Sequence, residues 1–495
     1  MKFLEAGKTC TRIERAAKLA FLIDYQAYFA ALETALKAAR RQVLILGWSF
    51  DPRTRLAPDG LKDPGAPDAI GRLLIELAQA HPRLEIKVLI WRSALAVSAT
   101  QGFFPHRAKG WFRGSGVDFA LDDTVPLGAC HHQKTVVIDD EVAFVTSGDV
   151  CGDRWDSPAH LDKDSRRLSP GGGMHAPRHE ASVLVEGPIA AALGDLARER
   201  WRLACEERIA PPLAGERRAW PDGLAPDVEG ARVGIARTEP RWRERSGAEE
   251  IAALTVEAIA GARKRLYIEN QYFTSPLVAE AIAARLLEPD GPEVVLVSTH
   301  QSVSWFDRLT MDRTRAIFIW RLQAADIFGR FRILAPFTVG GRPIVVHAKL
   351  MVVDDRLARI GSANLNNRSQ GFDTELELAL EAGTAAERAA IGRLADTLIG
   401  HWVGREAEDV ARARRRRGGL IAAIDDLNHG GRLRSIKPTP QGPLGSFIAR
   451  FHLGDPARAA DSWAPRRRRE DLYRQARAAE AALSSERSKS TITGR

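Results

Sequence analysis

A pair of matching motifs offers the residue types needed for chemistry on phosphate. Each motif reads histidine, any residue, lysine, four apolar or β-branched residues and aspartate. Side chains alternate between the two faces of a β-strand, so the histidine and lysine of each motif project to the same side. A neutral imidazole beside an ammonium group is suited to a phosphate site. The two motifs comprise His132, Lys134 and Asp139, and His347, Lys349 and Asp354.

The similarity between the two regions extends beyond the motifs. Asp149 and Asn364 lie at the same distance after their histidines, in Thr-Ser-Gly-Asp and Gly-Ser-Ala-Asn. Further on, Glu180 and Glu375 each precede an apolar run, which puts a late carboxylate at the start of a strand. Two motifs with matching downstream residues indicate an internal duplication of the chain.

With these features the sequence resembles the phospholipase D superfamily, whose signature is the doubled motif. The resemblance covers roughly residues 10 to 405. Residues 131–134, 152–156 and 267–273 are most similar to the true phospholipases D. They are less similar to the cardiolipin synthase and nuclease branches of the superfamily.

The resemblance implies an α/β fold of two α/β/α sandwich halves, related by a pseudo-twofold axis that brings the motif histidines face to face. We expect the first half at residues 10–205 and the second at residues 247–405. Residues 206–246, rich in proline, glycine and arginine, are expected to be loops that connect the halves. Residues 406–495 form a basic C-terminal extension without a counterpart in the repeat.

Local patterns support alternating helices and strands in both halves. Apolar residues recur at helical spacing over residues 24–41 and 251–263, and buried strands follow at 43–48 and 265–269. This alternation is typical of βαβ units. The next helix and strand are predicted at 69–80 and 84–91 in the first half, and at 277–287 and 293–298 in the second.

Phosphodiester transfer requires a nucleophile, an acid for the leaving alkoxide and positive charge for the non-bridging oxygens. The doubled motif supplies all three without a metal ion. By similarity to the family, His132 is the nucleophile and His347 is the general acid and base. Lys134 and Lys349 are expected to bind the phosphate oxygens.

The family resemblance also assigns supporting roles. Glu180 and Glu375 match carboxylates that orient the imidazoles, each expected to serve the histidine of the other half. Asp139 and Asp354 are expected to lock the motif backbone. Asp149 is a weaker ligand candidate because a carboxylate would repel phosphate unless Arg154 or a lysine neutralised it. The candidate substrate-binding residues are Asn364, Ser362, Asp149, Asn270 and Gln271.

Composition and charge favour an anionic partner. The chain has 495 residues, 45% of them hydrophobic, and a net charge of +9. Much of the excess charge lies in arginine runs at residues 412–417 and 466–469, and we expect the extension to attract anionic membranes. The expected state is a monomer at a phospholipid surface, without a stable nucleic-acid complex. The loop residues Phe103, Phe104, Trp305 and Phe306 could either contact lipid or cover the core.

Other features bear on cofactors and location. The four cysteines are too sparse for a disulfide framework and are expected to be free thiols. We expect no required cofactor or metal, although calcium could stimulate activity at a lipid surface. The N-terminus lacks an apolar signal core, and no run approaches the roughly 20 apolar residues that span a bilayer. These features predict a cytoplasmic or peripheral membrane protein, with export without a cleaved signal peptide left open.

The predicted function is a phospholipase D that hydrolyses glycerophospholipid headgroups to phosphatidate and alcohol, with transphosphatidylation. One alternative is a cardiolipin-synthase-like phosphatidyltransferase. Another is a phosphodiesterase or nuclease that acts on nucleic acid. Intact histidine, lysine and aspartate in both motifs argue against a non-catalytic binding protein.

Overall fold

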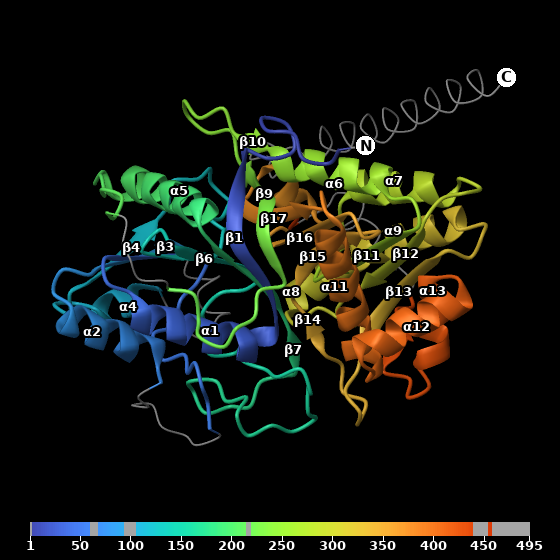
Figure 1. The fold of residues 1–495 in the computed structure, drawn as a ribbon, viewed down its shortest axis with the longest axis horizontal. Coiled ribbons are helices and arrows are strands. Elements are labelled where there is room, and N and C mark those ends of the chain that lie inside the picture. The colour runs from blue at the N-terminus through green and yellow to red at the C-terminus, as the bar shows by residue number, and fades with distance from the viewer. Residues whose placement is uncertain (1, 60–67, 94–104, 214–218, 439–453, 458–495) are drawn as a thin grey trace.

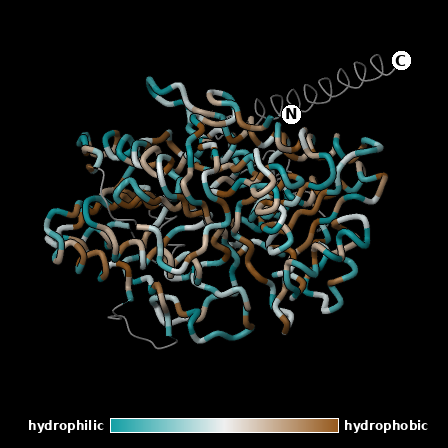
Figure 2. The backbone as a smooth tube through the Cα atoms, viewed as in Figure 1, coloured by the Kyte–Doolittle hydropathy of each residue, from teal (hydrophilic) through white to brown (hydrophobic). Residues whose placement is uncertain are grey.

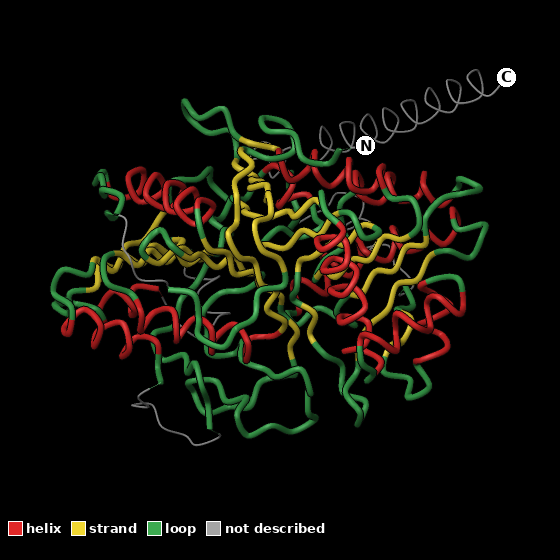
Figure 3. The backbone as a smooth tube through the Cα atoms, viewed as in Figure 1, coloured by secondary structure: helices red, strands yellow, loops and turns green. Residues whose placement is uncertain are grey.

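The computed structural model of the protein describes residues 2–59, 68–93, 105–213, 219–438 and 454–457. Strands run through the middle of the molecule, with helices on both sides (Figures 1 and 3). Many hydrophobic segments lie in this middle layer, and many of the outer loops are hydrophilic (Figure 2). The layers are those of the predicted α/β fold.

The first half is a mixed sheet in which β5, the strand between Lys134 and Asp139 of the first motif, lies between β2 and β6. The strand order is β4-β3-β2-β5-β6-β8-β1. Strands β2 and β5 are buried on both faces, which explains their continuous apolar sequences. The elements are β1 (Arg12–Ile23), α1 (Asp24–Ala38), β2 (Gln42–Gly47), α2 (Ile70–Ala80), β3 (Glu85–Trp91), α4 (Pro105–Trp111), β4 (Val117–Asp122), β5 (Thr135–Ile138), β6 (Val142–Thr146), β7 (Arg178–His179), β8 (Ala181–Glu186) and α5 (Pro188–Cys205).

The second half repeats this arrangement strand for strand. Its order, β13-β12-β11-β15-β16-β17-β9, matches the first half position by position, with β15 in the place of β5. This repetition confirms the duplicated α/β fold. The elements are β9 (Val228–Glu239), β10 (Ala248–Glu249), α6 (Glu250–Gly261), β11 (Arg265–Asn270), α7 (Pro276–Leu286), β12 (Glu293–Val297), α8 (Trp305–Asp307), the π-helical turn η1 (Arg308–Asp312), α9 (Arg313–Ala325), β13 (Phe331–Pro336), β14 (Val345–Val346), β15 (Lys349–Val353), β16 (Leu357–Gly361), α10 (Asn367–Gly371), β17 (Glu375–Glu381) and α11 (Ala385–Val403).

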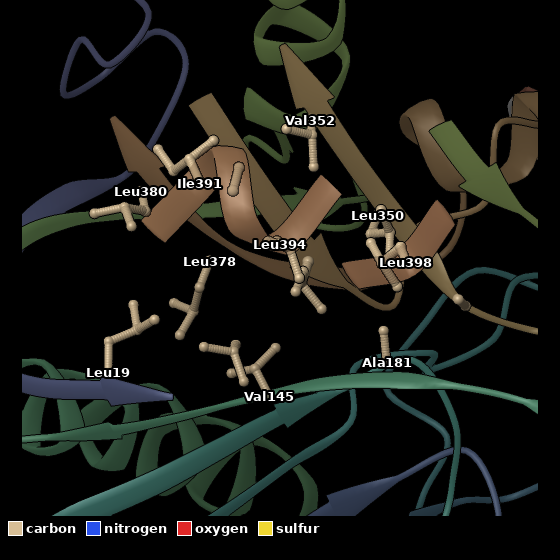
Figure 4. Close-up of a cluster of buried hydrophobic side chains, with 14 of the residues drawn as sticks. Leu19, Val145, Ala181, Leu350, Val352, Leu378, Leu380, Ile391, Leu394 and Leu398 are labelled. Carbon is tan, nitrogen blue, oxygen red and sulfur yellow. The ribbon is translucent and has the colours of Figure 1, made fainter. Parts of the chain in front are cut away.

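The two half sheets are joined edge to edge. Strand β1 pairs antiparallel with β9, with Arg12 opposite Ile235, so one continuous sheet crosses the molecule. Apolar side chains from both halves also form one shared core, which fixes the two motifs relative to each other. Figure 4 shows members of this core, with Leu19, Val145 and Ala181 from the first half and Leu378, Leu394 and Leu398 from the second.

Strand β9 lies within residues 206–246, where we expected only connecting loops. That expectation was wrong for Val228–Glu239, which forms the edge strand of the second half and pairs with β17 as well as β1. Glycine and arginine residues interrupt its apolar pattern. Its buried residues Val228, Ala231 and Val233 nevertheless belong to the shared core.

Part of the C-terminal extension belongs to the folded body. Arg414 pairs with Asp396 of α11, with 2.8 Å between Nη2 and Oδ2, so the first arginine run is partly anchored on the second half. Residues 466–469 lie outside the described part of the chain. None of the helices in the described residues combines the length and apolarity that crossing a bilayer demands. The extension contributes α12 (Ala407–Arg417), α13 (Leu420–Leu427) and β18 (Leu433–Ser435), which pairs with β13.

Candidate active site

The two motif histidines are held by backbone hydrogen bonds that run between the halves. The N–H of His132 donates to the carbonyl of Thr374 at 2.9 Å, and the N–H of His347 donates to the carbonyl of His179 at 2.8 Å. Thr374 and His179 each come directly before the late carboxylate of their own half. The site is therefore assembled where the two halves meet.

Each histidine side chain contacts a carboxylate from the opposite half. Nδ1 of His132 lies 2.9 Å from Oε2 of Glu375, and Nδ1 of His347 lies 2.9 Å from Oε2 of Glu180. Both carboxylates are fully buried. A proton held on Nδ1 in this way leaves Nε2 of His132 available for phosphorus. Nε2 of His347 lies 3.2 Å from Nζ of Lys349. The predicted pairing across the halves is confirmed.

Serine hydroxyls hold the two carboxylates in place. Ser147 donates to Glu180 at 2.6 Å, and Ser362 donates to Glu375 at 2.5 Å. Ser369 adds a second hydroxyl donor to Glu375 at 2.6 Å. We predicted Ser362 to bind substrate, and this was wrong, because its side chain is fully buried and its proton goes to the carboxylate. The equivalent position of Ser147 in the first half could have signalled this shared role.

The two motif lysines reach back to the histidines of their own motifs. Nζ of Lys134 donates to the carbonyl of His132 at 2.9 Å, and Nζ of Lys349 donates to the carbonyl of His347 at 2.7 Å. Both lysine side chains are almost completely buried. A buried ammonium group is costly unless an anion compensates its charge. The lysines therefore suit the negatively charged oxygens of a phosphodiester.

Asp149 is occupied by protein groups on both of its oxygens. Oδ2 lies 3.5 Å from Nζ of Lys134, and Oδ1 accepts hydrogen bonds from the backbone N–H groups of Trp48 and Ser49 at 2.8 and 3.2 Å. The predicted neutralisation by a lysine is confirmed. The prediction of Asp149 as a substrate ligand is corrected, because the carboxylate instead supports Lys134 and the end of β2.

The motif aspartates have a purely structural environment. Asp139 accepts hydrogen bonds from the backbone N–H groups of residues 40–42 at 2.7 to 2.8 Å. Asp354 accepts from those of residues 263–265 at 2.8 to 3.1 Å. Each aspartate thus ties the end of its motif strand to the start of the neighbouring strand, as predicted for a backbone lock.

The remaining amide side chains divide into a brace and two open candidates. Asn270 donates to the carbonyl of Ala363 at 3.3 Å and accepts from the N–H of Leu365 at 3.1 Å, so it braces the loop around Asn364. These bonds use one of the two N–H groups of the amide, so Asn270 also stays a predicted substrate ligand. The side-chain oxygen of Asn364 is buried and has no hydrogen-bond partner among the described residues. Asn364 and the partly buried Gln271 stay predicted substrate ligands.

Burial and charge favour neutral histidines in the site. Burial, together with the charges of Lys134 and Lys349, lowers the pKa of His132 well below its ordinary value. Burial and Lys349 likewise lower the pKa of His347. Burial raises the pKa of Glu375 to about 7, against the opposing effect of Lys134. A bound phosphate would favour the imidazolium form, so substrate charge and histidine protonation are coupled.

A buried histidine cluster next to the site could hold a metal ion. Asp24, His160, His179 and His401 each offer one ligand atom, and these atoms lie within 4.8 Å of one another. Oδ2 of Asp24 and Nε2 of His160 and of His401 have no hydrogen-bond partner among the described residues. His179 uses Nδ1 with Asp24 and Nε2 with Glu269. Sequence reasoning missed this group because its members come from separate segments.

Two of the four aromatic candidates for lipid contact, Trp305 and Phe306, lie in the described part of the chain. Trp305 and Phe306 on α8 are 69% and 48% exposed, so these side chains do not cover the core. Phe103 and Phe104 lie outside the described residues. The short helix α8 adjoins the site through Asp307, whose carboxylate accepts a hydrogen bond from the hydroxyl of Tyr272 at 3.1 Å.

Comparison with known proteins agrees with this geometry. Residues 35–211 match the family model described as "Phospholipase D", and residues 255–390 match the one described as "Cardiolipin synthase, PLD-like domain". Phospholipase D alpha 2 of Oryza sativa subsp. japonica is 24% identical over 486 residues, and phospholipase D alpha 1 of Ricinus communis is 25% identical over 480 residues. Each alignment covers 70% of this chain and 59% of the relative, so the chain spans about three fifths of the length of these curated relatives.

A solved structure shows the same fold. The phosphatidylserine synthase of Haemophilus influenzae Rd KW20 superposes with a TM-score of 0.55 and 14% sequence identity, covering 84% of this chain and 96% of that one. The protein described here belongs to the phospholipase D superfamily. One copy of the histidine–lysine–aspartate motif lies in each of the two matched segments.

Proposed function

We propose that this protein is a phospholipase D that hydrolyses the headgroup phosphodiester of glycerophospholipids to phosphatidate and an alcohol. One observation carries the proposal. The two motif histidines each bind, through Nδ1, a buried carboxylate from the opposite half, at 2.9 Å in both cases. This arrangement supports two imidazoles with opposite roles on one phosphorus atom, and the names of the curated relatives support a lipid substrate.

In the first step, Nε2 of His132 attacks phosphorus, and the bond from phosphorus to the headgroup oxygen breaks. His347, protonated on Nε2, gives its proton to the leaving alkoxide. Glu375 stabilises the positive charge that develops on the attacking imidazole. Lys134 and Lys349 hold the non-bridging oxygens, and the product of this step is a phosphohistidine.

In the second step, His347 removes a proton from water, and the water oxygen attacks phosphorus. The phosphorus–nitrogen bond breaks, His132 is regenerated and phosphatidate leaves. Two successive in-line displacements retain the configuration at phosphorus. An alcohol in place of water gives transphosphatidylation by the same step.

The chemistry as proposed uses no metal ion. The two buried lysines and one protonated histidine balance the phosphate charge, and Asn364 adds a hydrogen bond. Calcium could still act at the lipid surface. We further propose that the protein works as a monomer at the membrane surface and forms no stable complex with nucleic acid.

One alternative has an observation in its favour. The second half matches the model described as "Cardiolipin synthase, PLD-like domain", which favours a phosphatidyltransferase that accepts an alcohol rather than water. Both reactions share the first step. They differ in whether water or an alcohol attacks the phosphohistidine.

The proposal is tested by offering purified protein phosphatidylcholine, phosphatidylethanolamine, phosphatidylglycerol and single-stranded DNA, each in EDTA, and identifying products by mass. Formation of phosphatidate from a lipid supports the proposal. Transfer of the phosphatidyl group to an alcohol, without hydrolysis by water, supports the alternative. Cleavage of DNA without formation of phosphatidate overturns both. His132→Ala and His347→Ala should each lower turnover by about a thousandfold or more, because each removes a nucleophile or an acid. A folded variant that keeps a tenth of wild-type turnover would exclude the two-histidine mechanism.

A further inference from the structure

Two arginines outside the motifs lie beside His347 with few partners for their charge. The side chain of Arg178 is 10% exposed and that of Arg154 is 12% exposed. Burial of a guanidinium group normally requires that its donors be satisfied. The contacts proposed for the transferred phosphate involve the two motif lysines and do not explain why these two guanidinium groups are buried.

Arg178 is placed beside His347 by the pairing of β7 with β14. In this parallel pair Arg178 lies opposite Val345. Nη1 of Arg178 lies 3.8 Å from Oε1 of Glu180, the carboxylate whose other oxygen contacts Nδ1 of His347 at 2.9 Å. The guanidinium group is thus one carboxylate away from the proposed general acid.

Neither arginine forms a short ion pair. Nη2 of Arg178 and Nη1 of Arg154 lie 3.4 and 3.5 Å from the same oxygen of Asp153. These distances are long for a charged hydrogen bond, which is usually 2.7 to 2.9 Å. Nε of Arg154 and Nε2 of the nearby His175 are buried without a hydrogen-bond partner among the described residues. The two guanidinium groups therefore retain donors for a further acceptor.

The carboxylates around the two arginines balance their charge but not their hydrogen bonds. Asp153 is the carboxylate that both guanidinium groups approach, and Glu180 is the second carboxylate, 3.8 Å from Arg178. Burial alone would raise the pKa of Asp153, but Arg154 and Arg178 lower it to about 2, so the group is ionised. Because the contacts to both carboxylates are long, a further acceptor would complete the set of hydrogen bonds.

The proposed reaction puts the headgroup on this side of the site. His132 attacks phosphorus from one side, so the leaving headgroup oxygen lies on the opposite side, at His347. The charges of Arg154 and Arg178 act on His347, so the two guanidinium groups lie on the same side of the site as that oxygen. Two donor-rich guanidinium groups suit a planar carboxylate or a phosphate monoester, which accept two hydrogen bonds at once.

We propose that Arg154 and Arg178 form a subsite for a second acidic group on the leaving headgroup, so the preferred substrate is a phospholipid whose headgroup carries a carboxylate or a phosphate monoester. This inference rests on the proposed function. The subsite is distinct from the transferred phosphate, which the two motif lysines bind. A merely structural role for the two arginines, as braces for Glu180 and Asp153, predicts no such preference.

The substrate test compares phosphatidylserine with phosphatidylglycerol in mixed micelles of a neutral detergent. Both lipids carry one net negative charge, but only the serine headgroup has an acid group of its own, so attraction to the surface is matched. We expect kcat/KM to be at least about tenfold higher for phosphatidylserine, a difference near 1.4 kcal/mol. Phosphatidylglycerol phosphate, tested beside them, tells a phosphate preference from a carboxylate preference. Equal values for all three lipids would overturn the inference.

The variant test uses Arg178→Gln and Arg154→Gln, with Arg202→Gln on the exposed face of α5 as a control for the loss of one positive charge. Each site variant should raise KM for phosphatidylserine at least about tenfold more than it raises KM for phosphatidylglycerol. Arg178→Lys should recover part of the preference. Equal losses on both lipids would show a bracing role and overturn the inference.

Two outcomes are kept apart by design. If no phospholipid is hydrolysed, the proposed function fails. If lipids are hydrolysed without a preference for an acidic headgroup, only the subsite fails. Should the variants not fold, inhibition of the wild-type enzyme by O-phosphoserine and by phosphoethanolamine decides the matter, since the subsite predicts tighter binding of phosphoserine and equal inhibition contradicts it.

Discussion

Nδ1 of His132 and Oε2 of Glu375 lie 2.9 Å apart, although the two residues belong to different halves of the duplicated fold. The backbone of His132 is held at Thr374, so two consecutive residues set the position of this histidine and the orientation of its ring. The reciprocal contact joins His347 to Glu180. Each half therefore supplies a histidine whose carboxylate partner comes from the other half.

This exchange predicts the effect of removing the orienting charge. Glu375→Gln should lower kcat by about ten- to a hundredfold, because the imidazolium that forms on His132 loses its counter-charge while its position is largely kept. Glu377→Gln serves as the control, since Glu377 is a buried acid on the same strand that pairs with Arg359 instead. Turnover and melting temperature are measured for both. A kcat loss in the control equal to that of Glu375→Gln would show a general effect of removing a buried acid.

The motif aspartates should matter for stability rather than for chemistry. Asp354→Ala leaves the backbone N–H groups of residues 263–265 without their acceptor, which should cost about 3 kcal/mol of unfolding free energy. Asp355→Ala, at the exposed neighbouring position, should cost little. Urea unfolding followed by fluorescence gives both values. Similar midpoints for the two variants would contradict the backbone lock.

The pH dependence of activity should report the charge around His347. The general acid must be protonated, so kcat/KM falls as the pH rises through its pKa. Burial, Lys349 and Arg154 lower that pKa. Arg154→Gln removes a positive charge and therefore raises the pKa of His347. With phosphatidylcholine as substrate, the falling limb of the kcat/KM profile should move to higher pH. The rising limb belongs to His132 and should stay in place, and a shift of the falling limb to lower pH would refute the assignment.

Turnover should persist without divalent metal. Lys134 and Lys349 already supply the positive charge at the phosphate oxygens, so EDTA should leave hydrolysis of a short-chain soluble phospholipid nearly unchanged. The melting temperature is followed in parallel, because the cluster of Asp24, His160 and His401 could bind a stabilising ion. Complete loss of turnover at an unchanged melting temperature, restored by a metal, would contradict a metal-free mechanism.

Much of the site could be predicted because the duplicated motif repeats at fixed spacing and the family resemblance pairs its carboxylates with the opposite histidines. Strand β9 escaped prediction because its burial comes from the junction with β1, and its own glycine and arginine residues hide the pattern. Ser362 was assigned to substrate because it lies near a conspicuous motif. Only the three-dimensional structure reveals that its hydroxyl donates to Glu375, and that Asn270 also braces backbone groups.

The most direct test of the mechanism is to trap its covalent intermediate. The enzyme is mixed with a phospholipid labelled in its phosphate, quenched in alkali and digested, and the label is mapped by mass spectrometry. We expect a phosphoryl adduct on the peptide that contains His132. Label on the peptide that contains His347 would reverse the two roles, and rapid turnover without label on either histidine would contradict the covalent mechanism.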